Sequence, residues 1–183
     1  ALHSYIKGVI AMPKVFMRDL PQHTEKGIQL LLSTSVDIVN WQEKTVITND
    51  GQEFPYDKLL IATGGRPNKL QVPGSDVAGI FNFQYLSEAR DIVDWTQKAK
   101  SAVVTGGSYI SYELADAFVE RNIHTTWLIR GPRFLRRVIE EDGGKLVDNI
   151  ARSVGTDIIY GDEIQEVLTS HNQVAGVVTS SGK

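Results

Sequence analysis

A strand that runs into two glycines and continues as a helix places the strongest constraint on the fold. Residues 102–115 read Ala-Val-Val-Thr-Gly-Gly-Ser-Tyr-Ile-Ser-Tyr-Glu-Leu-Ala, and Ile110, Leu114 and Phe118 recur at helical spacing. Strand, tight glycine turn and helix form the opening of a dinucleotide-binding unit. The N-terminus of such a helix offers free backbone N–H groups and a partial positive charge to a pyrophosphate.

The glycine motif at residues 106–111 is incomplete. In the frame G-x-G-x-x-G, Gly106 can make the tight turn, but Ser108 and Ser111 replace the second and third glycines. We expect the Cβ atom of Ser108 to point at a bound phosphate and to weaken its binding. A buried strand followed by a purely structural glycine turn is therefore an alternative interpretation.

Strand and helix patterns alternate around this motif, which indicates an α/β fold. Upstream, a hairpin turn is predicted at Asn49-Asp50-Gly51. In the segment 56–67, the apolar run 59–62, closed by Thr63-Gly64-Gly65, predicts a buried parallel strand. The other expected strands are 28–32, 36–39, 44–48, 125–129, 157–160, 163–169 and 173–179, and the expected helices are 87–98, with Ser87 as N-cap, and 142–153. Residues 1–27 predict an irregular segment with one short helix. The last four residues form a turn without a returning strand, so we expect the sequence to be cut from a longer one.

The composition is that of a soluble globular protein. Of its 183 residues, 42% are hydrophobic and 22% charged, and the formal charge of −3 gives no reason to expect nucleic acid as a partner. No apolar run has the length of a membrane-spanning helix, and we expect no membrane partner. Without cysteine, the sequence contains no disulfide framework and no thiolate metal site. No histidine has metal-ligand spacing, no metal site is expected, and the default location is the cytoplasm.

Three segments in a fixed order resemble a known family. They are the hairpin with Asp50-Gly51, the run Tyr-Asp-Lys-Leu-Leu-Ile-Ala-Thr-Gly at 56–64 followed by Arg66-Pro67, and the motif at 106–115. Together they resemble the FAD- and NAD(P)H-dependent pyridine nucleotide–disulfide oxidoreductases, near the ferredoxin/rubredoxin reductase, NADH oxidase and nitrite-reductase-associated branch. The resemblance implies a flavoprotein fold with two dinucleotide-binding domains, Rossmann-like βαβ units with an antiparallel β-meander, truncated at both ends. It implies a partial FAD-binding domain at 1–84 and an NAD(P)-binding domain at 85–183 that lacks its last strand.

The same resemblance assigns cofactor contacts. The FAD contacts it implies are Ala62, Thr63, Gly64 and Arg66, and the alternative for this segment is a turn with a solvated arginine. The NAD(P) contacts it implies around the glycine turn are Gly106, Gly107, Ser108, Tyr109, Ile110 and Glu113. Glu113 would lie near the nicotinamide carboxamide, or would simply favour the helix N-terminus. Tyr109 would shield the flavin, or would pack in the core.

A basic loop follows the predicted strand 125–129, where many dinucleotide-binding folds carry an acid that accepts a hydrogen bond from the ribose 2′-OH. Here Arg130, Arg133, Arg136 and Arg137 occupy this region. Arginines can bind a 2′-phosphate through bidentate hydrogen bonds, so the sequence slightly favours NADP over NAD. The alternative is a solvated basic loop, neutralised by the acidic residues at 140–142.

The function that these features predict is a flavoprotein oxidoreductase. It would pass hydride from NAD(P)H to FAD and electrons to an acceptor, either a small redox protein or a small molecule. Such chemistry demands no general acid or base of residues 1–183, no catalytic residue is assigned, and we expect these residues alone to be inactive. The alternative is a non-catalytic dinucleotide-binding or assembly module with a degenerate glycine loop. A homodimer is one option for the oligomeric state, which the sequence leaves open.

Overall fold

The structure is a computed structural model that describes residues 1–183, and its internal contacts divide the chain into two units. Unit 1 comprises Ala1–Val15 and Pro67–Lys183, and unit 2 comprises Phe16–Arg66. Because the division follows contacts alone, the assignment of 1–84 and 85–183 to FAD- and NAD(P)-binding domains stays a prediction.

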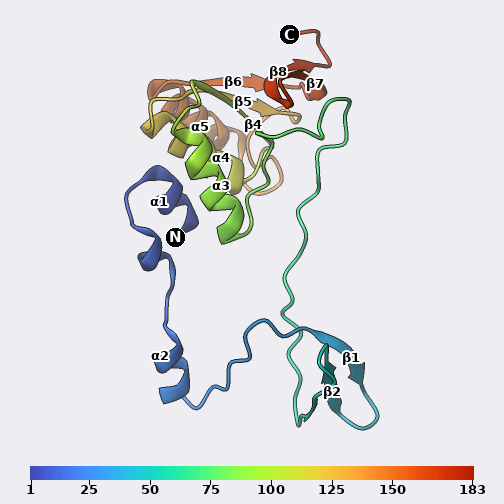
Figure 1. The fold of residues 1–183 in the computed structure, drawn as a ribbon. Coiled ribbons are helices and arrows are strands. Elements are labelled where there is room, and N and C mark those ends of the chain that lie inside the picture. The colour runs from blue at the N-terminus through green and yellow to red at the C-terminus, as the bar shows by residue number, and fades with distance from the viewer. The chain divides into compact units, whose positions relative to one another are not determined.

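A three-stranded parallel sheet forms the centre of unit 1 (Figure 1). Its strands lie in the order β4 (Ser101–Thr105), β5 (His124–Ile129) and β6 (Thr156–Tyr160), and the crossover helices are α4 (Tyr109–Glu120) and α5 (Glu141–Ser153). This βαβ alternation confirms the predicted Rossmann-like α/β class. The carboxyl ends of the strands therefore meet at one edge of the sheet, where ligands bind in such folds.

The core of unit 1 forms around the middle strand. β5 has a neighbour on each edge, and Trp127, Leu128 and Ile129 are almost completely buried because helices and loops cover its faces. The main cluster of buried residues comprises Val104, Ala115, Trp127, Ile129, Phe134, Ala151 and Ile158. It lies directly beneath the glycine turn that follows β4, so core packing and the geometry of that turn are coupled.

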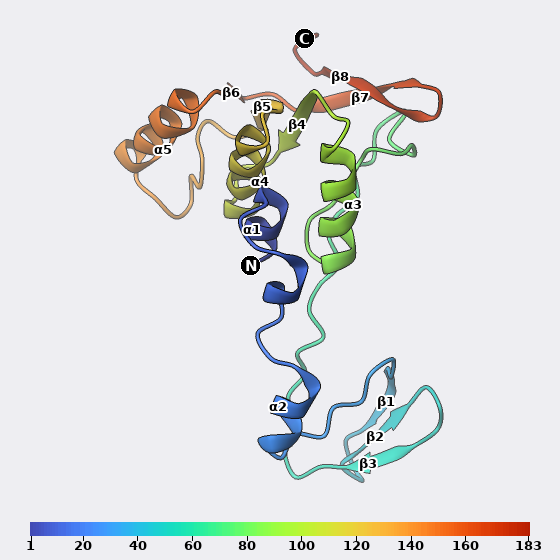
Figure 2. The same ribbon diagram turned by 60° about the vertical axis from the view of Figure 1, so that its left-hand side comes forward.

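The N-terminal helix α1 (Leu2–Lys7) packs against α4 and α3 (Leu86–Thr96), as Figure 2 shows. Ile6 is buried between these helices. The Lys7 Nζ atom lies 2.9 Å from the Asp116 carboxylate and 3.3 Å from that of Glu120, both on α4. Apolar burial and these ion pairs together hold the N-terminal segment on unit 1.

The N-terminal region contains more helix than the sequence predicted. Besides α1 it has a single 3₁₀ turn, η1 (Met12–Val15), and a helix in unit 2, α2 (Leu20–Glu25). Pro13 and Pro21 suggested irregular structure, but each lies in the first turn of its helix, where the missing N–H group has no intrahelical partner to lose. α3 also begins one residue before the predicted N-cap Ser87, because the Glu88 carboxylate accepts hydrogen bonds from the backbone N–H groups of Gln84 and Tyr85.

A β-hairpin follows the parallel sheet in unit 1. Its strands β7 (Ile164–Ser170) and β8 (Gln173–Thr179) meet at His171-Asn172, both at positive φ, which confirms the predicted turn. The segment before α3 packs closely on this hairpin. The Val167 N–H donates to the Pro73 carbonyl over 2.9 Å, and a Cβ atom on Gly74 would lie 2.1 Å from the Val167 carbonyl oxygen. Position 74 therefore has no room for a side chain.

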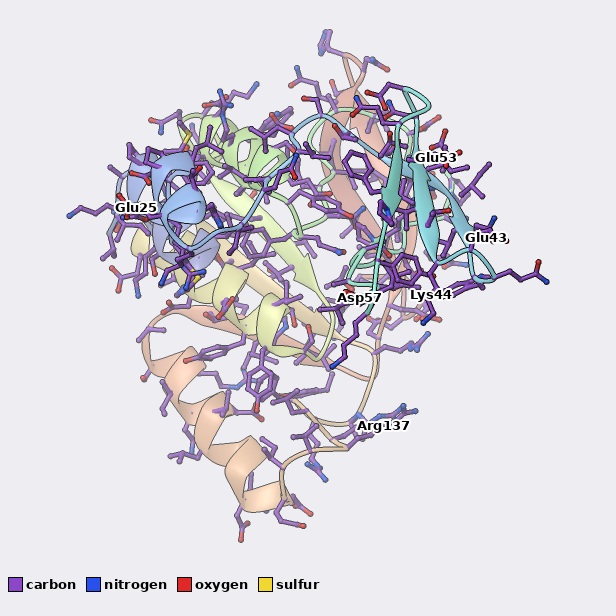
Figure 3. All side chains as sticks on the ribbon, turned by 90° about the horizontal axis from the view of Figure 1, so that it is seen from below. Glu25, Glu43, Lys44, Glu53, Asp57 and Arg137 are labelled. Carbon is purple, nitrogen blue, oxygen red and sulfur yellow. The ribbon has the colours of Figure 1, made fainter.

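Unit 2 contains an antiparallel meander of β1 (Val36–Asn40), β2 (Thr45–Thr48) and β3 (Glu53–Pro55). Gly51 has a φ of 80° in the turn between β2 and β3, so the predicted hairpin is confirmed. Charged side chains of this meander, among them Glu43, Lys44 and Glu53, project into solvent (Figure 3).

Two of the predicted strands, at 28–32 and at the apolar run 59–62, are absent. Both segments are irregular, and the Leu60 side chain is 86% exposed. A buried parallel strand needs a partner strand beside it and cover on both faces, and unit 2 offers only the antiparallel meander. An apolar run predicts burial, but without a partner strand it cannot form a sheet. No helix in the structure combines the length and the apolar character that a membrane crossing requires.

Candidate functional site

The glycine turn after β4 is held in place from both sides. Gly106 has a φ of 124°, its N–H donates to the Leu128 carbonyl over 3.0 Å, and its carbonyl accepts from the Trp127 indole Nε1–H over 2.7 Å. The Leu135 N–H donates to the Gly107 carbonyl over 3.1 Å. These bonds fix the backbone at the point where a phosphate would approach it.

The first turn of α4 is capped by the two serines that replace the motif's glycines. Ser108 is the N-cap residue, its N–H donates to the Ser111 hydroxyl over 3.0 Å, and that hydroxyl donates to the Ser108 carbonyl over 2.7 Å. The Ser108 hydroxyl is turned toward the Ser111 N–H, 3.5 Å away. The expectation that the Cβ atom of Ser108 weakens phosphate binding stays a prediction. The next N–H groups of the helix have no intrahelical acceptor and can meet an anion.

Aromatic side chains support this turn from below. The Trp127 ring is 0% exposed and lies 5.9 Å from the Tyr112 ring and 5.3 Å from the Phe134 ring, and Tyr109 meets Phe134 edge to face at 6.0 Å. Trp127 was not among the site residues predicted from the sequence. The sequence could have indicated this role, because the N–H of a buried indole in a central strand needs a hydrogen-bond acceptor nearby.

A cavity of about 840 Å³ opens at the glycine turn. Residues 105–108, the segment 69–72, the loop after β5 and the start of β7 form its walls. The cationic side chains in these walls are Lys69, Arg130, Arg133, Arg136 and Arg137. Glu163 is the one acidic residue that lines the cavity. Free N–H groups beside this excess of positive charge form an environment suited to a diphosphate.

The four arginines of the predicted basic loop all line this cavity but differ in their contacts. The Arg133 guanidinium donates to the backbone carbonyls of Ile139 and Arg136, so it braces the loop. The Arg130 Nη1 atom lies 3.7 Å from the Glu163 carboxylate. Arg137 projects from the loop (Figure 3), and Arg130 and Arg137 are therefore better placed than Arg133 to meet a ligand.

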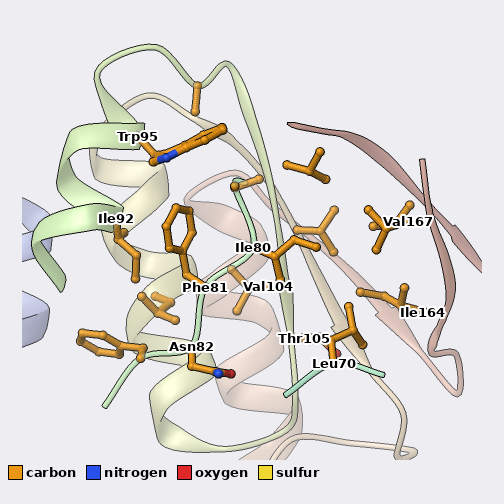
Figure 4. Close-up of a pocket in the computed structure, with 18 of the residues that line it drawn as sticks. Leu70, Ile80, Phe81, Asn82, Ile92, Trp95, Val104, Thr105, Ile164 and Val167 are labelled. Atoms are coloured by element: carbon orange, nitrogen blue, oxygen red, sulfur yellow. The ribbon is translucent and has the colours of Figure 1, made fainter. Parts of the chain in front are cut away.

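A second, larger cavity of about 1250 Å³ lies beside β4 (Figure 4). Figure 4 shows its apolar walls, with Ile92 and Trp95 from α3, Phe81 from the preceding segment, Val104 from β4 and Val167 from β7. Ser108 and Ile110 also line this cavity, whereas Tyr109 and Glu113 line neither cavity. One edge of β4 faces this space without a partner strand.

The residues that the family resemblance assigned to FAD lie in unit 2 and line neither cavity. Ala62, Thr63, Gly64 and Arg66 are all exposed in an irregular segment. Gly64 has a φ of 71°, as a turn requires, and a Cβ atom there would meet nothing within 4 Å. The assignment of these four residues to FAD stays a prediction.

Comparisons with known proteins match nearly the whole chain. The family model "Pyridine nucleotide-disulphide oxidoreductase" matches residues 2–183. Putidaredoxin reductase CamA of Pseudomonas putida is 31% identical over 184 residues, covering 98% of this chain and 44% of that protein. NADH oxidase of Enterococcus faecalis is 28% identical over 184 residues, covering 97% of this chain and 41% of that protein.

Structural comparison agrees with the sequence comparison. The crystal structure of the covalent putidaredoxin reductase–putidaredoxin complex superposes with a TM-score of 0.90 and 30% identity, covering 100% of this chain and 45% of that one. The chain thus spans less than half the length of these relatives. The predicted fold and family are confirmed: the chain belongs to the pyridine nucleotide-disulphide oxidoreductase family.

Proposed function

We propose that this chain supplies the nicotinamide-dinucleotide site of an FAD-dependent NAD(P)H oxidoreductase. The observation that carries the proposal is the smaller cavity, where the glycine turn and the first turn of α4 stand opposite the basic loop after β5. Family membership supports the flavin part of the proposal. The proposed reaction passes hydride from NAD(P)H to FAD and then electrons to an acceptor.

Each group in the cavity has a role in binding and orientation. The N–H groups at the start of α4 receive the pyrophosphate, and Gly106 lets the backbone approach it. Trp127 fixes the turn through its hydrogen bond to Gly106. Arg130 and Arg137 stand at the adenosine end, after the second strand of the βαβ unit. FAD supplies the redox chemistry when bound, and the residues of this cavity position the nicotinamide partner.

The proposed acceptor is a small redox protein. Putidaredoxin reductase supports this class, since it is named for putidaredoxin and the superposed structure shows such a reductase in a covalent complex with putidaredoxin. The name NADH oxidase keeps a small-molecule acceptor as the second candidate.

NADH is the proposed donor. The slight preference for NADP that the arginines suggested finds no support in the names of the relatives, which include NADH oxidase and rubredoxin-NAD(+) reductase. Within the site, the Arg133 guanidinium donates to backbone carbonyls and the Arg130 guanidinium lies beside the Glu163 carboxylate. The name of the matched NADH oxidase states the same donor.

The test of the proposed function uses the protein produced from its complete gene. We expect a visible flavin absorption spectrum that bleaches when NADH is added under anaerobic conditions, and NADH-dependent reduction of artificial electron acceptors. A flavin-free protein that takes up no FAD on reconstitution would contradict the proposal. A folded protein that binds NADH without such turnover would instead support the non-catalytic dinucleotide-binding module.

We also propose that a strand from outside residues 1–183 pairs with the free edge of β4, as the predicted NAD(P)-binding domain requires. Val103 is 42% exposed on β4, although its neighbours in the larger cavity are apolar. Val103→Lys in the protein from the complete gene is expected to lower the free energy of unfolding by about 2 kcal/mol or more, since it would bury an unpaired charge. Urea unfolding measures this loss. A change within about 0.5 kcal/mol, typical of a solvent-exposed position, would contradict the proposal.

A further inference from the structure

Glu163 is the acidic residue in the wall of the smaller cavity, and it lies beside Arg130. Its carboxylate lies 3.7 Å from the guanidinium of Arg130, the residue that directly follows β5. In dinucleotide-binding folds that position faces the ribose 2′-OH. A group that contacts Arg130 therefore lies within reach of the Glu163 charge as well.

The backbone of Glu163 is fixed on both sides. Its N–H donates to the Asp162 carboxylate over 3.0 Å, and its carbonyl accepts from the Ser180 N–H over 2.9 Å. Asp162 is buried and also receives the hydroxyls of Ser181 and Ser180 at 2.6 and 2.7 Å. These hydrogen bonds, of which the one from Ser181 has the largest effect, hold the pKa of the Asp162 carboxyl well below its usual range. The Asp162 side chain therefore stays ionised and keeps accepting them.

A second set of bonds ties this segment to the basic loop. The Gly161 N–H donates to the carbonyls of Ile129 and Gly131 at 2.9 and 3.3 Å, on either side of Arg130. The connection between β6 and β7 and the loop after β5 are therefore held together by backbone hydrogen bonds. The backbone of the fold therefore places Glu163 beside Arg130.

We propose that Glu163 is the residue that favours NADH over NADPH at this cavity, an inference that rests on the proposed function. Its carboxylate can accept a hydrogen bond from a ribose 2′-OH, and it repels a 2′-phosphate. It also neutralises part of the charge of Arg130, which a 2′-phosphate would otherwise meet. The carboxylate that other dinucleotide-binding folds carry after their second strand is here supplied by the connection after the third.

A purely structural role for the pair has little physical basis. The Arg130 and Glu163 side chains are 80% and 57% exposed, and ion pairs so exposed contribute little to stability. Removing the Glu163 charge should therefore leave the fold intact, so a binding experiment can isolate its effect on selectivity.

The test compares Glu163→Gln with Glu166→Gln in the protein produced from its complete gene. Glu166 is exposed on β7 and lines neither cavity, so its replacement makes the same change in net charge away from the site. The dissociation constants of NADH and NADPH are measured by titration at low ionic strength. Glu163→Gln is expected to tighten NADPH about tenfold, the scale of one like-charge contact near a protein surface. NADH should change by no more than about twofold, because the amide oxygen can still accept from the 2′-OH.

The outcomes separate the inference from the proposed function. An unchanged ratio of NADPH to NADH affinity in Glu163→Gln, with normal NADH binding by the wild type, overturns the inference alone. An equal rise of this ratio in Glu166→Gln assigns the effect to net charge and also overturns it. A wild-type protein that binds neither nucleotide overturns the proposed function and the inference together.

Discussion

Trp127→Ala is expected to lower the free energy of unfolding by about 3–5 kcal/mol, the cost of deleting a buried indole. Trp127 is completely buried at the centre of the main core cluster, in contact with the rings of Tyr112 and Phe134. A loss of this size is a large fraction of the stability of a typical domain. Urea unfolding measures it, and a loss below about 1 kcal/mol would show that the core does not depend on this side chain.

Trp127→Phe separates packing from positioning. The phenyl ring keeps much of the apolar contact but cannot donate to the Gly106 carbonyl, which the indole reaches over 2.7 Å. We expect a smaller loss of stability together with weaker NADH binding by about 1 kcal/mol, or roughly fivefold, the scale of one hydrogen bond. Unchanged NADH affinity in this variant would limit Trp127 to a role in packing.

The sequence predicted the elements between residues 101 and 179 well because their signals are local. The glycine turn at 106–107, the helical spacing that begins at Ile110 and the turn at His171-Asn172 each lie within a few residues. The structure places β4, α4 and the hairpin β7–β8 within about two residues of the prediction. Periodicity and turn residues therefore determine these elements before any long-range contact forms.

The failures have a common physical cause. The apolar runs at 28–32 and 59–62 predict burial, but a strand exists only with a partner, and the sequence does not say which segment that is. Their exposure in unit 2 follows from the absence of such a partner within Phe16–Arg66. Local propensity alone could not have distinguished these runs from the strand predicted at 36–39, which does form as β1.

The same distinction holds for the candidate site. The glycine turn and the basic loop are contiguous in sequence and were predicted, and the arginines at 130, 133 and 137 do line one cavity. Lys69 and Glu163 reach that cavity from other connections, and Trp127 reaches Gly106 across the sheet. Such residues are recognised only once the fold is known, because they come from segments that are distant in the sequence. They change the charge and the backbone geometry of a site whose main parts, the glycine turn and the basic loop, can be recognised from short stretches of sequence.

Gly106→Ala is expected to weaken NADH binding by about 10- to 100-fold while leaving the fold largely intact. Gly106 has a φ of 124°, a conformation that an L-residue adopts only under strain, at a cost of about 1–3 kcal/mol. Space is not the obstacle, since the nearest atom to an added Cβ is the Ser111 hydroxyl at 3.6 Å. The backbone can relieve the strain by rotating, and this rotation would turn the N–H groups of the turn away from the phosphate.

The matched control for this prediction is Gly107→Ala. Gly107 does not have a positive φ, and an added Cβ would lie 3.2 Å from the Ile129 side chain, which a shift of a few tenths of an ångström accommodates. NADH titration should therefore show a much smaller loss for Gly107→Ala than for Gly106→Ala, and urea unfolding should show both variants folded. Equal losses would mean that the bulk of a methyl group, and not the backbone conformation at Gly106, limits the approach of the dinucleotide. Wild-type affinity in Gly106→Ala would mean that the phosphate does not lie over this turn, because no bound phosphate could tolerate the reoriented N–H groups.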